Sequence, residues 1–138
     1  MRILDVCAGT GSISFEFLSR ECGQITAVDQ NHLCVRHLLK MAEHFNCKNH
    51  IVAVKSEVLK FLEQKGQSYD LIFADPPYDF KGYETLIRLV FQGGWLDENG
   101  VLIVEHGKET SLEHITHFQF MRIYGNVRFS FFEISPEE

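Results

Sequence analysis

The segment Asp75-Pro76-Pro77-Tyr78 combines residue types that could activate an amino group. The Asp75 carboxylate and the Pro76 carbonyl are two acceptors that could hold both N–H bonds of one exocyclic amino group. Such a nitrogen is a poor nucleophile because its lone pair is delocalised into the ring of a base, and two acceptors would draw it toward a tetrahedral shape. Restricted proline geometry would keep both acceptors in place. A proline-stiffened turn with a capping aspartate is the alternative.

Tyr78 adds an aromatic face to this segment, and a base stacked on such a face gains roughly 1 to 3 kcal/mol. A base inside a helix cannot present its amino group to a methyl donor, so the substrate nucleotide must be flipped or already exposed. The predicted catalytic residues are therefore Asp75, Pro76, Pro77 and Tyr78.

A glycine-containing turn and two acidic residues upstream are typical of a nucleotide-cofactor site. Asp5 would end the first strand, and the turn Ala8-Gly9-Thr10-Gly11 would let the backbone approach a ligand closely. Asp29 follows about 20 residues later, where a carboxylate can accept hydrogen bonds from a ribose diol. Ser14 replaces the third glycine of the dinucleotide fingerprint, which favours S-adenosylmethionine, a cofactor without a pyrophosphate, with Asp5 at its methionine end. A turn that serves only packing is the alternative.

The segment Ser56-Glu57-Val58 would follow the third strand and could reach the adenine of the same cofactor. Glu57 could equally be an acidic residue in the first turn of a helix, where the helix dipole favours negative charge. The expected cofactor-binding residues are Asp5, Ala8, Gly9, Thr10, Gly11, Asp29, Gln30, Ser56, Glu57, Val58 and Asp75.

These segments can meet only if parallel strands bring them to one edge of a sheet. Apolar runs bounded by turn residues alternate with segments of helical period, which predicts a doubly wound, Rossmann-like α/β sheet that is mostly parallel. Ligands of such sheets bind at the carboxyl ends of the strands. Strands are expected at residues 3–6, 24–28, 51–54, 69–74 and 101–105, and helices at 12–20, from a cap at Asn31 to near Asn46, at 56–64 and at 83–91.

The end of the chain is expected to leave this parallel pattern. Residues 118–124 and 127–134, joined at Gly125-Asn126, predict an antiparallel hairpin that closes one edge of the sheet. A turn is expected at Asn99-Gly100, before the strand at 101–105. The first strand begins almost at Met1 although it should be central, so we expect that a helix or a hairpin once preceded it.

Composition favours one compact domain over residues 1–138, with a hydrophobic fraction of 45%. No apolar run approaches the roughly 18 to 20 residues of a membrane span, and no signal peptide is evident, so a soluble, cytoplasmic protein is expected. The four cysteines lack close paired spacing and are expected to be reduced. A net charge of −6 argues against binding nucleic acid by bulk attraction to phosphates.

Three other groups of residues could carry chemistry. A metal site could be sought among Cys34, His37, His44 and Cys47. The first and last of these would lie roughly 20 Å apart on one helix, so no metal is expected. The segment Glu105-His106-Gly107-Lys108 could contact substrate or be a plain loop. A local basic patch could involve Arg2, Arg20, Lys81, Arg88, Lys108, Arg122 and Arg128, which the sequence cannot place on one face.

At these motifs the chain resembles class I methyltransferases with an Asp/Asn-Pro-Pro-Tyr/Phe loop, and within them the bacterial 16S rRNA guanine-N2 methyltransferase family. The resemblance runs nearly end to end. Cys7 stands where a Phe is usual, and Glu57 where an Asp is usual. The matching segments are residues 4–12 with Glu16, Ser19 and Arg20 for the first motif, residues 73–78 for the catalytic motif, and Tyr124-Gly125-Asn126-Val127 for the closing hairpin.

The resemblance implies a monomeric enzyme that uses S-adenosylmethionine to methylate N2 of a guanine in 16S rRNA, either in free RNA or in the assembling small subunit. Family members carry a basic segment before the first strand, which would help to bind RNA. The alternatives are methylation of adenine N6 in DNA or RNA or of a protein glutamine, a cofactor-binding ribosome-assembly factor without catalysis, and a nucleotide-dependent oxidoreductase.

Overall fold

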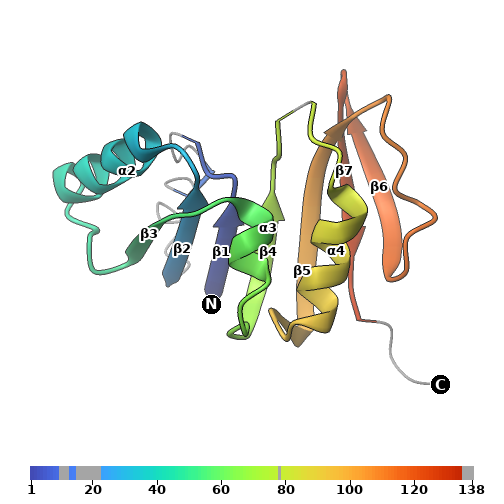
Figure 1. Cartoon of the computed structure of the whole chain (residues 1–138), viewed down its shortest axis with the longest axis horizontal. Coiled ribbons are helices and arrows are strands. Elements are labelled where there is room, and N and C mark those ends of the chain that lie inside the picture. The colour runs from blue at the N-terminus through green and yellow to red at the C-terminus, as the bar shows by residue number, and fades with distance from the viewer. Residues whose placement is uncertain (10–12, 15–22, 78, 135–138) are drawn as a thin grey trace.

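A sheet of seven strands organises the residues that the computed structural model describes, which are 1–9, 13–14, 23–77 and 79–134 (Figure 1). The spatial order of the strands is β3-β2-β1-β4-β5-β7-β6. Strands β1 to β5 run parallel, and β7 pairs antiparallel with both β5 and β6. The strands are β1 Arg2–Val6, β2 Gln24–Asp29, β3 Ile51–Lys55, β4 Tyr69–Ala74, β5 Leu96–Gly107, β6 Phe118–Tyr124 and β7 Val127–Phe132.

The first strand is central, as the sequence predicts, because it lies between β2 and β4. Its side chains Ile3, Leu4 and Val6 are fully buried, which fits a parallel strand covered on both faces. The register places Asp5 of β1 beside Ala27 of β2 and Phe73 of β4. Asp5 therefore lies one residue from the carboxyl end of the strand, next to the ends of both neighbours.

Helices cover the two faces of the sheet separately. Helix α2, His32–His44, buries Leu38 and Ala42 in one cluster with alternate strand residues, among them Ile3. The helices α3, Val58–Leu62, and α4, Tyr83–Gln92, pack in the other cluster, with Leu4 and Val6 of the same strand (Figure 1). This alternation confirms the doubly wound α/β architecture. Of the helix expected at residues 12–20, only Ile13 and Ser14 are described, and both are helical.

The prediction of a turn at Asn99-Gly100 is wrong, because both residues lie inside β5. Tyr69 of β4 lies opposite Leu96, whereas Leu71 lies opposite Val101, so the register of the two strands shifts between these pairs. The dipeptide therefore lies in an irregular stretch of a longer strand that pairs with β4 on both sides of the shift. This longer range of pairing overrides the local preference for a turn.

The antiparallel hairpin at the end of the chain is confirmed, with β6 at the edge of the sheet and Gly125 at a positive φ of 60° in the turn. Phe120 of β6 stacks on Phe131 of β7 with ring centroids 4.4 Å apart, and the Arg122 guanidinium lies 5.3 Å from the centre of the Phe120 ring. Across the described part of the chain, none of the helices has the length and apolar character that a membrane crossing requires.

We expect Asn31 to stabilise the start of α2, because its side-chain oxygen accepts a hydrogen bond of 2.8 Å from the Leu33 N–H. Asn31→Ala should lower the free energy of unfolding by about 1 kcal/mol in urea titrations, whereas Asn31→Asp should retain the cap. His32→Ala, at the next exposed position, is the matched control and should change stability little. Equal stability of Asn31→Ala and the parent protein would show that the cap contributes nothing.

Candidate active site

The turn after β1 is shaped by two left-handed backbone positions, Cys7 at φ 63° and Gly9 at φ 58°. A positive φ is unusual for cysteine and ordinary for glycine. The Ala8 N–H between them donates a 2.9 Å hydrogen bond to the Val28 carbonyl of β2. The turn is therefore anchored on the neighbouring strand, close to the position that the sequence predicts for a cofactor loop. Thr10 and Gly11, also predicted there, lie outside the described residues.

Asp29 joins this turn to the beginning of α2. One oxygen of its carboxylate accepts a 2.8 Å hydrogen bond from the Gly9 N–H, and the other accepts a 2.9 Å bond from the Asn31 N–H. Each oxygen keeps a further lone pair, so the carboxylate can still accept from a ligand. Gln30, between these contacts, is exposed.

Asp5 is a buried carboxylate, only 1% exposed. The Ser14 hydroxyl donates a 2.7 Å hydrogen bond to it. The pKa of Asp5 is raised to about 7, mainly by burial and to a smaller extent by the charges of Asp75 and Asp29, while the Ser14 hydrogen bond opposes the shift. In the sequence, Ser14 is notable only because it replaces the third glycine of the dinucleotide fingerprint. In the structure, its hydroxyl helps to hold this carboxylate.

The loop that follows β4 faces the same edge of the sheet. Asp75 is exposed, Pro76 is buried and Pro77 is exposed. The Phe80 N–H donates a 2.9 Å hydrogen bond to the Pro77 carbonyl, which closes the loop. Partial burial raises the pKa of the Asp75 carboxyl. Tyr78, predicted as the stacking residue, lies outside the described residues.

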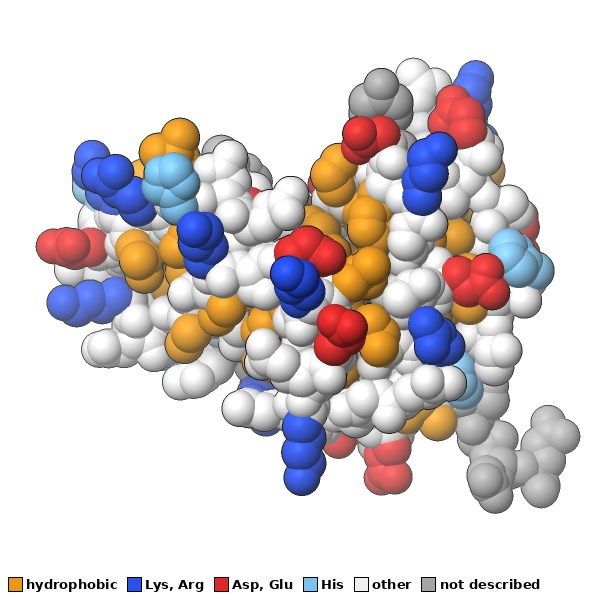
Figure 2. Space-filling model, in the orientation of Figure 1, with side chains coloured by type: hydrophobic (Ala, Val, Ile, Leu, Met, Phe, Trp, Pro, Cys, Tyr) orange, Lys and Arg blue, Asp and Glu red, His pale blue; other side chains and the backbone are white. Residues whose placement is uncertain are grey.

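One pocket of about 560 Å³ brings the two loops together. Figure 2 shows the molecule hollowed at the upper edge of the view, with hydrophobic side chains exposed in the hollow. The described lining contains three carboxylates and no Lys, Arg or His, so the pocket favours a positively charged ligand. The lining residues are Asp5, Cys7, Ala8, Gly9, Ile13, Asp29, Phe73, Asp75, Pro76 and Pro77.

The predicted adenine-binding segment lies near this pocket but is not part of its described lining. The Ser56 N–H donates a 3.0 Å hydrogen bond to the Asp29 carbonyl, which fixes the segment beside β2. Glu57 is the N-cap of α3, and its carboxylate accepts a hydrogen bond from the Leu59 N–H. Val58 is buried in the core. The contact with Leu59 supports the interpretation of Glu57 as an acidic residue at the start of a helix. A contact between Glu57 and adenine stays a prediction.

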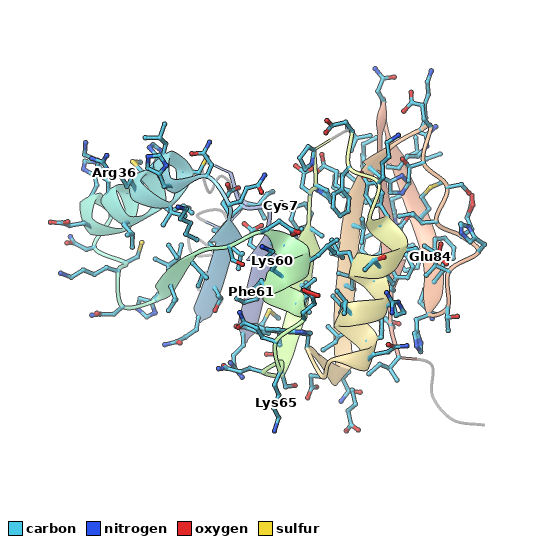
Figure 3. All side chains as sticks on the ribbon, in the orientation of Figure 1. Cys7, Arg36, Lys60, Phe61, Lys65 and Glu84 are labelled. Atoms are coloured by element: carbon cyan, nitrogen blue, oxygen red, sulfur yellow. The ribbon has the colours of Figure 1, made fainter. Side chains whose placement is uncertain are left out.

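Sequence reasoning missed Cys7 and Tyr83 as neighbours of the site. Figure 3 labels Cys7, which lies just after β1 in the pocket lining. Burial, with a smaller contribution from nearby carboxylates, raises the pKa of the Cys7 thiol to about 12, so the side chain is a neutral thiol rather than a thiolate nucleophile. Tyr83, the first residue of α4, is 6% exposed, and burial followed by the charge of Asp75 raises the pKa of its phenol. Only the unusual cysteine at position 7 gave a signal in the sequence.

Residues 105–108 divide between the core and the site. His106 is 5% exposed, and its ring nitrogens lie 2.7 Å from the Ser130 hydroxyl and 2.9 Å from the Gly107 carbonyl, so it is a core residue. Glu105, on the opposite face of β5, is half-buried. Burial raises the pKa of the Glu105 carboxyl, and the charge of Asp75 adds to the effect.

Two of the basic residues that the sequence offered for a local patch, Arg2 and Arg122, lie on strands far apart in the sheet, and Arg20 lies outside the described residues. Arg2 lies at the amino end of β1, away from the pocket, where its guanidinium donates to the Ser68 carbonyl and the Gln67 side chain. Arg122 lies on β6, at the edge of the sheet. On the face drawn in Figure 2, basic and acidic side chains are interspersed.

A solved structure of a putative methyltransferase from Escherichia coli shares this fold, with a TM-score of 0.87, 26% sequence identity and coverage of 95% of this chain and 75% of that one. Two curated relatives carry the name "Ribosomal RNA small subunit methyltransferase D". The relative from Haemophilus influenzae is 32% identical over 112 residues, covering 79% of this chain and 58% of that protein. The relative from Escherichia coli K12 is 32% identical over 109 residues, covering 79% of this chain and 54% of that protein.

The chain therefore spans a little more than half the length of these curated relatives. A family model described as "Conserved hypothetical protein 95" matches residues 1–133, which is nearly the whole chain. The match includes both loops of the pocket and the closing hairpin. The chain belongs to this family of conserved hypothetical proteins.

Proposed function

We propose that this chain is an S-adenosylmethionine-dependent methyltransferase that transfers a methyl group to the exocyclic N2 of a guanine in 16S rRNA. The observation that carries the proposal is the pocket in which Asp75 and Pro76 face the turn held by Asp29. Two curated relatives named as ribosomal RNA small subunit methyltransferases support the choice of substrate. The RNA, free or in an assembling small subunit, is the proposed partner of a monomeric chain.

The charge of the pocket fits this cofactor. S-adenosylmethionine would supply a methyl group activated by a positively charged sulfonium, and its methionine end carries an ammonium group. Asp5, Asp29 and Asp75 line the pocket without a described counter-charge. We assign Asp5 to the methionine end and the remaining lone pairs of Asp29 to the ribose diol. A volume of about 560 Å³ lies within the usual range of small-molecule sites.

The catalytic role falls to the loop after β4. The Asp75 carboxylate and the Pro76 carbonyl would accept the two N–H bonds of the amino group and so turn its lone pair toward the methyl donor. Pro76 is buried and Pro77 accepts the Phe80 N–H, so the acceptors are held before the base arrives. A carboxyl with a raised pKa is also a better base, which suits Asp75 to take the proton that leaves the nitrogen. Tyr78 is the proposed stacking face for the exposed base.

Removal of the Asp75 carboxylate should abolish most of the activity without removing the cofactor. We expect Asp75→Ala to lower kcat by about 100-fold or more, as general-base removal commonly does, while the affinity for S-adenosylmethionine falls by a smaller factor, because Asp5 and Asp29 still line the pocket. Activity is measured as labelled methyl transfer to unmodified small ribosomal subunits, with N2-methylguanine identified by mass spectrometry after nuclease digestion. Asp79→Ala removes an exposed carboxylate four positions away and is the matched control.

The same assay distinguishes the alternative acceptors. Naked ribosomal RNA, DNA and a protein extract are offered in parallel with the subunits. Label found only in DNA or only in protein would refute the proposed substrate. Full activity of Asp75→Ala on the subunits would refute the proposed catalytic role of this residue.

Cofactor binding should strengthen as the pH rises toward 7. In the empty protein Asp5 is largely protonated below its pKa of about 7, whereas a positively charged ligand favours the carboxylate. The bound state therefore has the lower pKa, and the affinity should fall by up to about tenfold for each pH unit below 7. Isothermal titration calorimetry with S-adenosylmethionine between about pH 5 and pH 9 measures this dependence.

Two variants identify the titrating group in this experiment. Asp5→Asn should bind weakly with little pH dependence in that range. Ser14→Ala removes the hydroxyl that donates to Asp5, which should move the transition to higher pH. A constant affinity of the parent protein from pH 5 to pH 7 would show that Asp5 does not face the cofactor.

A further inference from the structure

Glu105 and Asp75 occupy neighbouring positions at the carboxyl ends of two adjacent parallel strands. The register pairs Phe73 with Ile103 and Ala74 with Val104, so Asp75 and Glu105 follow as the next positions on the two chains. Side chains alternate between the faces of a sheet, which places Glu105 on the face of Ile103 and away from the core residue His106. Adjacent strands lie about 4.8 Å apart. The Glu105 carboxylate therefore lies beside the described lining of the pocket, on the side of Asp75.

Both carboxylates are available to a ligand. Within the described ranges, no hydrogen-bond donor or cationic side chain contacts the carboxylate of either Asp75 or Glu105. Two neighbouring carboxylates without a counter-charge repel each other, and the pKa of Glu105 is raised by burial and by Asp75 accordingly. Such a pair is best complemented by a ligand edge that presents two adjacent donors.

The Watson–Crick edge of guanine has this arrangement, because its N1–H lies next to the N2 amino group. Adenine has an amino group beside an N1 lone pair, which a carboxylate would repel. A metal ion is the less suitable ligand, since no group of three or more metal-binding side chains exists among the residues that the structure describes.

We propose that Glu105 is a specificity-determining residue that accepts the N1–H of the target guanine while Asp75 holds its N2 amino group. This assignment rests on the proposed function and deepens it, because it gives a physical reason for guanine rather than adenine. A site built around such a hydrogen bond discriminates strongly against a base that cannot form it. Glu105 would bind and orient the base, and the transfer itself would proceed on N2 as described above.

The test uses one RNA substrate in two versions, with guanine or with 2,6-diaminopurine at the target position. The second base keeps the N2 amino group but has an N1 lone pair in place of N1–H. The parent protein should prefer guanine by about tenfold or more in kcat/KM. In Glu105→Gln the amide can donate to the bare N1, so activity on 2,6-diaminopurine should rise. Activity on guanine should fall, because the charged acceptor of its N1–H is lost. The ratio of the two kcat/KM values should therefore change by at least about tenfold.

Two further variants keep the outcome unambiguous. Glu105→Ala should bring the ratio of kcat/KM on guanine to kcat/KM on 2,6-diaminopurine close to one. This variant removes both the attraction of the carboxylate for the guanine N1–H and its repulsion of the bare N1 of 2,6-diaminopurine. Glu109→Gln, at an exposed position on the same segment, should leave the ratio as in the parent protein. An equal loss on both substrates in Glu105→Gln, with an unchanged ratio, would assign Glu105 a purely structural role and overturn the proposal. Absence of methyl transfer from the parent protein to either RNA would instead overturn the proposed function itself.

Discussion

The parallel alignment of β1, β2, β4 and β5 is the constraint on which the site depends. It brings the carboxyl ends of strands that are distant in sequence to one edge, and acidic side chains end several of them. The repulsion between these carboxylates opposes folding, and the buried apolar side chains of the two clusters on the faces of the sheet offset it. Negative charge is concentrated in this way at one pocket of the protein, where a cationic ligand can bind.

The pocket is held in shape by contacts within the protein. The turn after β1 is anchored by the Ala8 hydrogen bond to Val28 and by the Asp29 carboxylate, and the loop after β4 is stiffened by its two prolines. The described residues of both loops are thus held by contacts and proline geometry that do not require a ligand. Binding to such a preorganised site costs less conformational entropy than binding to a loop that must first be ordered.

Local patterns predicted much of the fold, since the strand at 69–74 and the cap at Asn31 agree with the structure. They failed where pairing partners decide the outcome, because the turn preference of Asn99-Gly100 is overridden by the pairing of β5 with β4. The candidate site shows the same division. Motif spacing placed Asp5, Asp29 and Asp75 at one edge, and their shared pocket agrees. The different environments of Glu105 and His106 depend on strand register and burial, which a single sequence does not reveal.

Asp29 has a consequence for how this protein can change its ligand. Its two carboxylate oxygens hold the N–H groups of Gly9 and Asn31, so a single side chain connects the turn, the end of β2 and the start of a helix. A substitution selected for a different ligand at this position would also loosen that corner of the domain. Ligand binding and local stability therefore depend on the same side chain. A substitution of Asp29 that alters the ligand would require compensating changes in the surrounding backbone.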